Sequence, residues 1–188
     1  MHKLSLACLL LFCFSQVAAK EVAGVSIAEQ IQREADHAEL VLNGAGVRKK
    51  FFFKIYIAAL YLEQRTGDVS SVMASEGAAR VEMRILYSKV EQEKFVEGWN
   101  EGFTANLTQE EMNQVRERLE RFNGMFETLQ EGDLIELDYF PAKGTGVRIK
   151  GVEKGVIPGA DFFQALLKVW LGDKPVNESL KQNLLGHY

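Results

Sequence analysis

The sequence predicts one α+β domain preceded by an export signal, on the strength of three observations. Apolar residues recur at every second position in some runs and at spacings of three and four in others, which indicates both strands and helices. The two kinds of run are grouped in blocks instead of alternating strictly, which favours α+β over a doubly wound α/β fold. The length of 188 residues suits a single domain, and we find no internal repeat, low-complexity tract or linker.

Residues 1–19 have the parts of a secretory signal peptide. His2 and Lys3 form a short positive region, residues 4–14 are an apolar stretch, and Val17-Ala18-Ala19 supplies small residues before a cut after Ala19. A bilayer span needs about 20 apolar residues, so this stretch is too short to anchor the chain. A buried first helix is the alternative. We expect residues 20–188 to form one soluble domain, periplasmic or secreted.

Composition excludes several classes of function. The chain carries a net charge of −4, which becomes −5 when Lys3 leaves with the signal, and it has no long basic run. A dedicated nucleic-acid binder is therefore not expected. Both cysteines and one of the three histidines lie in residues 1–19, which leaves little for a transition-metal site. No nucleotide, metal or haem motif is present, so we expect no cofactor.

Five segments are predicted as strands. Residues 39–43 form the first, which ends at a turn, Gly44-Ala45-Gly46, and residues 47–62 form a long second strand. Further strands are expected at 79–87, at 134–140 and at 146–152, with Gly144-Thr145-Gly146 as a turn and Val152–Val156 as an extension.

The long strand has two different faces. One face carries Phe51, Phe53, Ile55, Ile57, Ala59 and Tyr61. The other begins with Lys50 and Lys54 and continues with Tyr56, Ala58, Leu60 and Leu62. One face should lie in the core and the other should be partly covered, as in a sheet roofed by helices.

Helices are predicted at about 90–104, 108–128 and 160–171, with a short one that Asn177 caps. Thr108 and Glu111 have the spacing of a capping box at the start of the second helix. Aromatic residues in these segments and in the long strand are expected to form ordinary core: Phe51, Phe53, Trp99, Phe103, Phe122 and Phe126.

Two arginines lie in otherwise apolar strand segments. Arg48 begins the long strand, and Arg84 lies within the strand at 79–87. In one interpretation they reach solvent or pair with Glu82 or Glu93. In the other they enter a cleft and hold an anion, because a guanidinium binds a carboxylate through two parallel hydrogen bonds.

The run Leu42-Asn43-Gly44-Ala45-Gly46-Val47-Arg48, followed by a strand that ends Tyr61-Leu62-Glu63, resembles the chalcone isomerase family. Gly155-Val156-Ile157-Pro158 and the segment from Trp170 to Leu180 also look like that family. The resemblance covers about residues 22–186. With its export signal and short length, the chain looks like the bacterial chalcone-isomerase-like branch of the family. It implies an open antiparallel sheet with helices layered on one face and a ligand cleft between them.

The resemblance also implies roles for single residues. Arg48 matches the arginine that orients the phenolate in chalcone isomerases, and Asn100 matches an asparagine that lines their cleft. Tyr56 stands where those enzymes have a threonine, and Arg84 falls near their lysine.

Two more family positions differ in ways that matter for chemistry. Glu93 falls near the active-site tyrosine, and Val169 replaces a threonine of the C-terminal segment. A carboxylate and an isopropyl group lack the donors that ring closure requires. The pattern is more similar to the non-catalytic, fatty-acid-binding branch of the fold.

Three functions follow from these observations. The preferred one is an exported binding protein for a small amphipathic carboxylate or aromatic ligand, without turnover. Its expected ligand-binding residues are Arg48, Arg84, Tyr56, Asn100, Trp99 and Phe103. The second is an isomerase or intramolecular lyase on a phenolic or enone substrate, with Arg48 as electrophile. The third is a periplasmic accessory protein with a protein partner.

Overall fold

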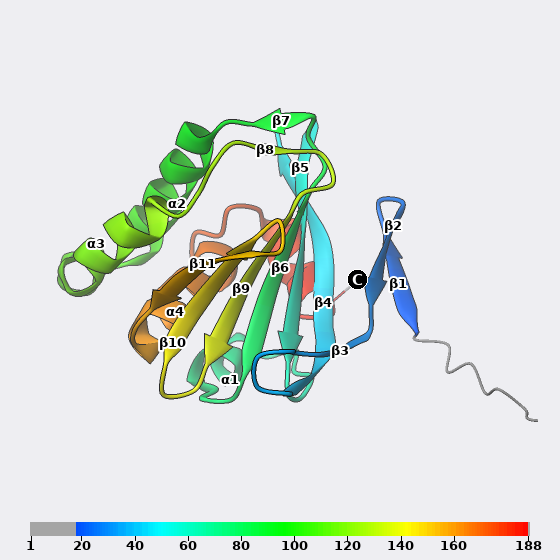
Figure 1. Ribbon diagram of the computed structural model, residues 1–188, viewed down its shortest axis with the longest axis horizontal. Coiled ribbons are helices and arrows are strands. Elements are labelled where there is room, and N and C mark those ends of the chain that lie inside the picture. The colour runs from blue at the N-terminus through cyan, green and yellow to red at the C-terminus, as the bar shows by residue number, and fades with distance from the viewer. Residues whose placement is uncertain (1–17, 188) are drawn as a thin grey trace, which may run out of the picture.

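A seven-stranded antiparallel sheet organises the chain, and the computed structural model describes residues 18–187. The strand order is β11-β10-β9-β6-β5-β4-β3, and every neighbouring pair is antiparallel (Figure 1). The strands are β3 (Gln30–Gln32), β4 (Glu39–Lys50), β5 (Phe53–Leu62), β6 (Ala79–Ile85), β9 (Leu134–Phe140), β10 (Gly144–Ile149) and β11 (Val152–Ile157). This is the curled, open sheet that the family resemblance implies.

Two short two-stranded sheets accompany the main sheet. β1 (Ala19–Val22) and β2 (Val25–Ala28) project beside β4, and β7 (Lys89–Val90) pairs with β8 (Leu129–Gln130) at one end of the sheet (Figure 1). The proposed signal peptide is almost wholly within residues 1–17, outside the described residues. A cut after Ala19 would remove only the first residue of β1.

Helices cover one face of the sheet and form the larger core with it. They are α1 (Val69–Ala74), α2 (Gln92–Asn106), α3 (Gln109–Asn123), α4 (Ala160–Leu171) and α5 (Glu178–Leu184). α4 is almost wholly buried, and its Trp170 and Leu166 join the same apolar cluster as Leu60 of β5 and Phe122 of α3. None of the helices within residues 18–187 is both long enough and apolar enough to span a bilayer.

The predicted glycine turn at residues 44–46 is wrong. β4 runs through it to Lys50, and the chain reverses at Phe51-Phe52 instead. Gly44 and Gly46 are required by packing: a Cβ on Gly44 would collide with the carbonyl oxygen of Asn183, and one on Gly46 would lie 2.7 Å from the Asn183 Cβ. The glycines therefore let the end of α5 lie directly on β4.

The predicted turn at residues 144–146 is also wrong. Those residues begin β10, and the reversal occurs one step earlier, where Lys143 N–H donates to the Phe140 carbonyl over 3.0 Å. A second reversal at Lys150-Gly151 separates β10 from β11, so the expected continuous strand is two. Both glycine stretches therefore lie within strands, where Gly44 and Gly144 allow another segment's backbone to approach closely.

The predicted starts of α3, α4 and α5 are confirmed, but the predicted end of α3 is wrong. Thr108 accepts from the Glu111 N–H while Glu111 accepts from the Thr108 N–H, which completes the capping box of α3. Asn177 caps α5 by accepting a hydrogen bond from the Leu180 N–H, and α4 has the expected bounds. α3 ends at Asn123, five residues before its expected end at 128, because the chain turns at Gly124 towards β8.

The face of the sheet away from the helices carries a charged network. Asp138 of β9 accepts two hydrogen bonds from Arg80 of β6, at 2.8 and 2.9 Å, and one from Arg33 at 3.3 Å. Arg80 also pairs with Glu136, 2.6 Å away. Arg33, Arg80 and Asp138 are all buried, so this network satisfies charges that would otherwise be costly to remove from water.

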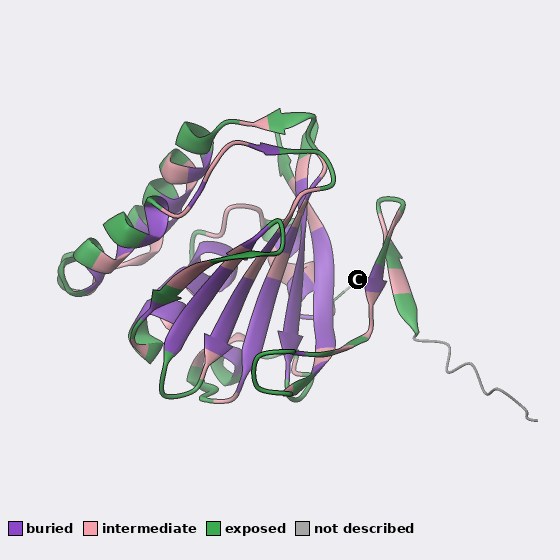
Figure 2. Cartoon of the chain, viewed as in Figure 1, coloured by how far each residue is buried: buried purple, intermediate pink, exposed green. Residues whose placement is uncertain are grey.

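The expected aromatic core is correct for the helices and wrong for the strand. Trp99, Phe103, Phe122 and Phe126 are buried in contacting pairs. Phe51, however, is 86% exposed and Phe53 is 55% exposed. Both belong to the β4–β5 reversal, which extends beyond the sheet at the end where β7 lies (Figure 2).

Candidate functional site

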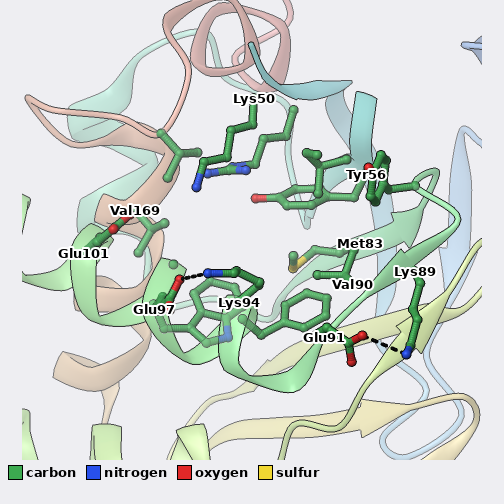
Figure 3. Close-up of a pocket in the computed structure, with 17 residues that line it drawn as sticks. Lys50, Tyr56, Met83, Lys89, Val90, Glu91, Lys94, Glu97, Glu101 and Val169 are labelled. Atoms are coloured by element: carbon green, nitrogen blue, oxygen red, sulfur yellow. Dashed lines mark hydrogen bonds and ion pairs between the residues drawn. The ribbon is translucent and has the colours of Figure 1, made fainter. Parts of the chain in front are cut away.

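A cavity of about 200 Å³ lies between the helix-covered face of the sheet and helices α2 and α4. Its walls are Ile55, Met83, Val90, Phe95, Trp99 and Val169, which come from β5, β6, β7, α2 and α4. Its rim is polar and charged. Figure 3 shows Tyr56 and Val169 on opposite sides of the same space, with Lys50 above it. An apolar pocket with a few convergent polar groups is the usual form of a small-molecule site.

Arg48 and Tyr56 are brought together by the pairing of β4 with β5. The two residues are direct partners in the register, so their side chains share the helix-facing side of the sheet. The guanidinium carbon of Arg48 lies 5.7 Å from the centre of the Tyr56 ring. Arg48 is half-buried, and within residues 18–187 no carboxylate lies within ion-pair distance of it. Its charge is therefore available to an anion in the cavity.

Tyr56 is held as a hydrogen-bond donor. Its side chain is buried, and its hydroxyl oxygen accepts a hydrogen bond from the Trp170 Nε1–H over 3.0 Å. Burial raises the pKa of Tyr56, although Arg48 and the Trp170 hydrogen bond partly oppose this. The hydroxyl thus keeps its proton at neutral pH, and no acceptor for that proton lies in the described part of the chain. An acceptor atom in the cavity would fill that place.

Trp99 forms part of the cavity wall. Its ring lines the cavity and packs edge-on against Trp170 and Phe122, at centroid separations of 5.6 and 5.3 Å. The Trp99 Nε1–H is buried, and it has no acceptor among the described residues. An unpaired buried donor costs about 1–3 kcal/mol of stability.

Most charges on the rim neutralise one another. Lys89 pairs with Glu91 and Lys94 pairs with Glu97, each at 2.7 Å (Figure 3). Lys50 also lines the rim and, among residues 18–187, makes no ion pair. The uncompensated positive charge is therefore concentrated on β4, where Arg48 and Lys50 lie. On the α2 side the rim includes Glu101.

Arg84, expected beside Arg48, lies on the opposite face of the sheet. The register pairs Arg84 with Ile57 and pairs Ile85 with Tyr56, so the arginine points away from the cavity. Its Nε is buried and, in the part of the chain described, without a hydrogen-bond partner. Arg84 belongs to the charged side of the sheet and does not line the cavity.

Asn100 and Phe103 are also outside the cavity. Asn100 accepts a hydrogen bond of 2.8 Å from Asn123 Nδ2 and borders a separate depression between α2 and α3. Phe103 is fully buried against Phe162, with ring centroids 5.7 Å apart. Of the six expected residues, the structure brings together Arg48, Tyr56 and Trp99. Val169 lines the cavity as well, and Glu93 is exposed outside it.

The sequence prediction of the site omits most of the apolar wall and two polar residues, Trp170 and Lys50. The period-two pattern places Lys50 on the Tyr56 side of one long strand, but the chain reverses at Phe51-Phe52, so the two residues belong to different strands and the pattern is no valid signal for their proximity. Trp170 touches the site through Tyr56 and through the ring of Trp99. Its indole is brought there by the packing of α4 in the core, a long-range contact that no local pattern reveals.

Comparisons with known proteins agree on the fold. A family model described as chalcone isomerase-like matches residues 19–186. Among solved structures, an Arabidopsis thaliana fatty-acid binding protein superimposes with a TM-score of 0.63 and 15% sequence identity, covering 84% of this chain and 96% of that one. At that identity the likeness concerns the fold. No curated protein matches the sequence.

Proposed function

The chain belongs to the chalcone isomerase-like family, and we propose that it is an exported protein that binds a small amphipathic carboxylate without converting it. One observation carries the proposal: an unpaired arginine and a tyrosine with a free proton face the same apolar cavity. The fatty-acid binding activity of the structural relative supports the same class of ligand.

Each part of the ligand has a matching part of the cavity. The carboxylate would accept from the Arg48 guanidinium and the Tyr56 hydroxyl, both of which are charge-assisted hydrogen bonds. The apolar portion would lie against Met83, Phe95 and Val169. The cavity volume of about 200 Å³ is below the usual ~300–1,000 Å³ of drug-sized ligand pockets. A short acyl chain or a single-ring aromatic acid therefore fits better than a long fatty acid.

The proposal assigns no turnover to this site. Val169 offers the ligand no donor where the resemblance places a threonine, and Glu93 does not line the cavity. An isomerase acting on a phenolic enone needs several donors around a developing enolate. A protein-partner function is less favoured, because it predicts a closed core with Arg48 and Arg84 both exposed, whereas both are half-buried and Arg48 lines a cavity.

Calorimetric titration tests the binding function. The mature protein, residues 20–188, is titrated with octanoate, decanoate and cinnamate, and then with octanol as an uncharged analogue. We expect the carboxylates to bind and octanol to bind about tenfold more weakly or worse, since it lacks the charge-assisted contacts. Equal binding of octanol and octanoate would contradict a carboxylate site.

Variants assign the contacts. Arg48→Met and Tyr56→Phe should each weaken carboxylate binding about tenfold or more, because each removes one hydrogen bond to a charged group. Arg84→Met is the matched control: it deletes an arginine of β6 on the other face of the sheet and should leave affinity unchanged. A loss with Arg84→Met equal to that with Arg48→Met would refute the assigned site.

Two further measurements address turnover and export. Incubation with chalcone-type enones, followed by chromatography, should return the substrates unchanged; a cyclised product that disappears in Arg48→Met would establish an enzyme. Mass spectrometry of the full chain expressed in an exporting host should give a mature N-terminus at Lys20. A chain that keeps residues 1–19 would remove the export part of the proposal.

A further inference from the structure

The β4–β5 reversal presents three consecutive phenylalanines to solvent. Phe51 is 86% exposed, Phe52 is 98% exposed and Phe53 is 55% exposed. Tyr87 packs edge-on against Phe53, with centroids 5.5 Å apart, and is itself exposed. The reversal lies at the β7 end of the sheet in Figures 1 and 2. We call residues 49–54 the aromatic tip.

The aromatic tip is unfavourable for the fold alone. Phe51 has φ of +56°, a left-handed conformation that glycine or asparagine adopts at much lower cost than a bulky side chain. Three exposed phenyl rings leave apolar surface in water, so they do not contribute the stabilisation that a buried aromatic side chain gives. Neither feature contributes to packing of the sheet, so the tip is suited to a contact outside the chain.

The charges within residues 48–54 are all of one sign. Arg48, Lys49, Lys50 and Lys54 flank the phenylalanines, and no acidic residue lies between 48 and 54. Within residues 18–187 none of these four cations makes an ion pair. The whole chain nevertheless has a net charge of −4, so the tip is a local cationic and aromatic projection on an acidic protein.

We propose that the aromatic tip docks the protein on the surface of an anionic lipid bilayer. The phenyl rings of Phe51 and Phe52 enter the boundary between headgroups and acyl chains, where their apolar surface is removed from water. Lys49 and Lys54 keep their ammonium groups at the level of the lipid phosphates while their methylene stems follow the rings inward.

A lipid surface fits this tip better than a second copy of the chain. A two-fold contact between tips would bring four cations against four, with no carboxylate to neutralise them. The three rings lie on a projecting turn and form no groove or flat face of the kind that a protein interface requires. Bilayer phosphates are complementary in charge, and a fluid acyl layer accommodates a projecting wedge.

The tip is also continuous with the cavity. Lys50 and Tyr87 belong both to the neighbourhood of the tip and to the cavity lining, and Lys89 of β7 borders the same opening. Docking by the tip would therefore face the cavity opening towards the membrane, where amphipathic acids partition. The docking itself does not depend on the proposed ligand function, and it is measured without any added ligand.

Vesicle sedimentation provides the test. The mature protein is mixed with vesicles of phosphatidylglycerol and phosphatidylcholine in equal parts, or of phosphatidylcholine alone. We expect binding to the anionic vesicles that weakens about tenfold or more in Phe51→Ser/Phe52→Ser and in Lys49→Glu/Lys54→Glu. Val152→Ser, which removes another exposed apolar side chain, and Lys143→Glu/Lys174→Glu, which makes the same charge change elsewhere, should bind like the wild type.

A fluorescent variant reports insertion directly. The two native tryptophans are buried, so Phe52→Trp adds one exposed reporter. Its emission should shift to the blue when anionic vesicles are added.

Absence of vesicle binding by the wild type, equal binding by the tip variants, or no shift in Phe52→Trp would each overturn the proposal. A dimer in gel filtration that becomes monomeric in Phe51→Ser/Phe52→Ser would instead assign the tip to self-association. Arg48→Met should lose carboxylate binding and largely retain vesicle binding, which separates the two proposals.

Discussion

The indole Nε1–H of Trp170 donates a hydrogen bond to the hydroxyl oxygen of Tyr56, 3.0 Å away, and so ties α4 to β5 inside the core. The bond uses the acceptor capacity of the hydroxyl and leaves its proton for another partner. It also fixes the direction of the tyrosine side chain, whose ring forms part of the cavity wall. A core contact thereby sets the geometry of the candidate site.

Trp170→Phe should therefore weaken both stability and carboxylate affinity. Loss of the indole leaves a void and an unsatisfied hydroxyl, which together should lower the free energy of unfolding by about 2–4 kcal/mol. Urea denaturation measures the first effect and calorimetric titration with octanoate the second. In a double-mutant cycle with Tyr56→Phe, the affinity losses should be less than additive. Full additivity would mean that Trp170 does not act through Tyr56.

The sequence was informative about faces and much less so about turns. Period-two alternation correctly placed Tyr56, Ala58 and Leu60 on one side of β5 because each strand alternates strictly. Gly44 and Gly46 were misread as a turn because their cause is the end of α5, a contact more than a hundred residues away. Local patterns carry no record of such a contact.

The candidate site shows the same division. Arg48 was expected in the cleft, and it lines the cavity as a direct strand partner of Tyr56. Arg84 was misplaced because which face of β6 meets the helices depends on its register with β5, and shifting that register by one residue exchanges the two faces. The exposed tip was missed because the strand was extended through Phe51-Phe52, which are the reversal.

Gly44→Ala should be strongly destabilising. A methyl group at this position would overlap the Asn183 carbonyl, so α5 must lift from β4, and we expect a loss of about 3 kcal/mol or more in the free energy of unfolding. Gly98→Ala is the matched control in urea denaturation. Gly98 is a helical glycine, and a methyl group added there would meet no atom within 4 Å, so alanine should raise stability by about 1 kcal/mol. Similar losses in both variants would show that α5 does not rest on Gly44.

Asp138→Ala should lower the free energy of unfolding, because Asp138 is the centre of the buried charged network. The substitution leaves Arg33 and Arg80 with less of their negative partner in a buried site, and it should cost about 3–5 kcal/mol. Asp161→Ala removes a carboxylate from the exposed pair with Arg118 and should cost about 1 kcal/mol or less. Thermal and urea unfolding of the two variants measure the difference. Equal small losses would indicate that water reaches Arg33 and Arg80.

Alkaline pH should destabilise the fold through its buried tyrosines. Burial raises the pKa of both Tyr56 and Tyr61 above the ordinary value of 10.0, so at high pH the unfolded chain loses protons that the folded chain retains. The free energy of unfolding should then be unaffected by these groups below about pH 10 and fall above it, by up to ~1.4 kcal/mol per pH unit for each tyrosine.

Urea denaturation between pH 8 and 11.5 measures that slope. Tyr56→Phe lacks one of the two ionisable groups, so its stability is lower at pH 8 because the Trp170 hydrogen bond is lost, yet it should decline less steeply above pH 10. Tyr87→Phe, at an exposed position, should keep the wild-type slope. If Tyr56→Phe and the wild type decline in parallel, the Tyr56 hydroxyl ionises as readily in the folded protein as in the unfolded chain, and burial does not raise its pKa.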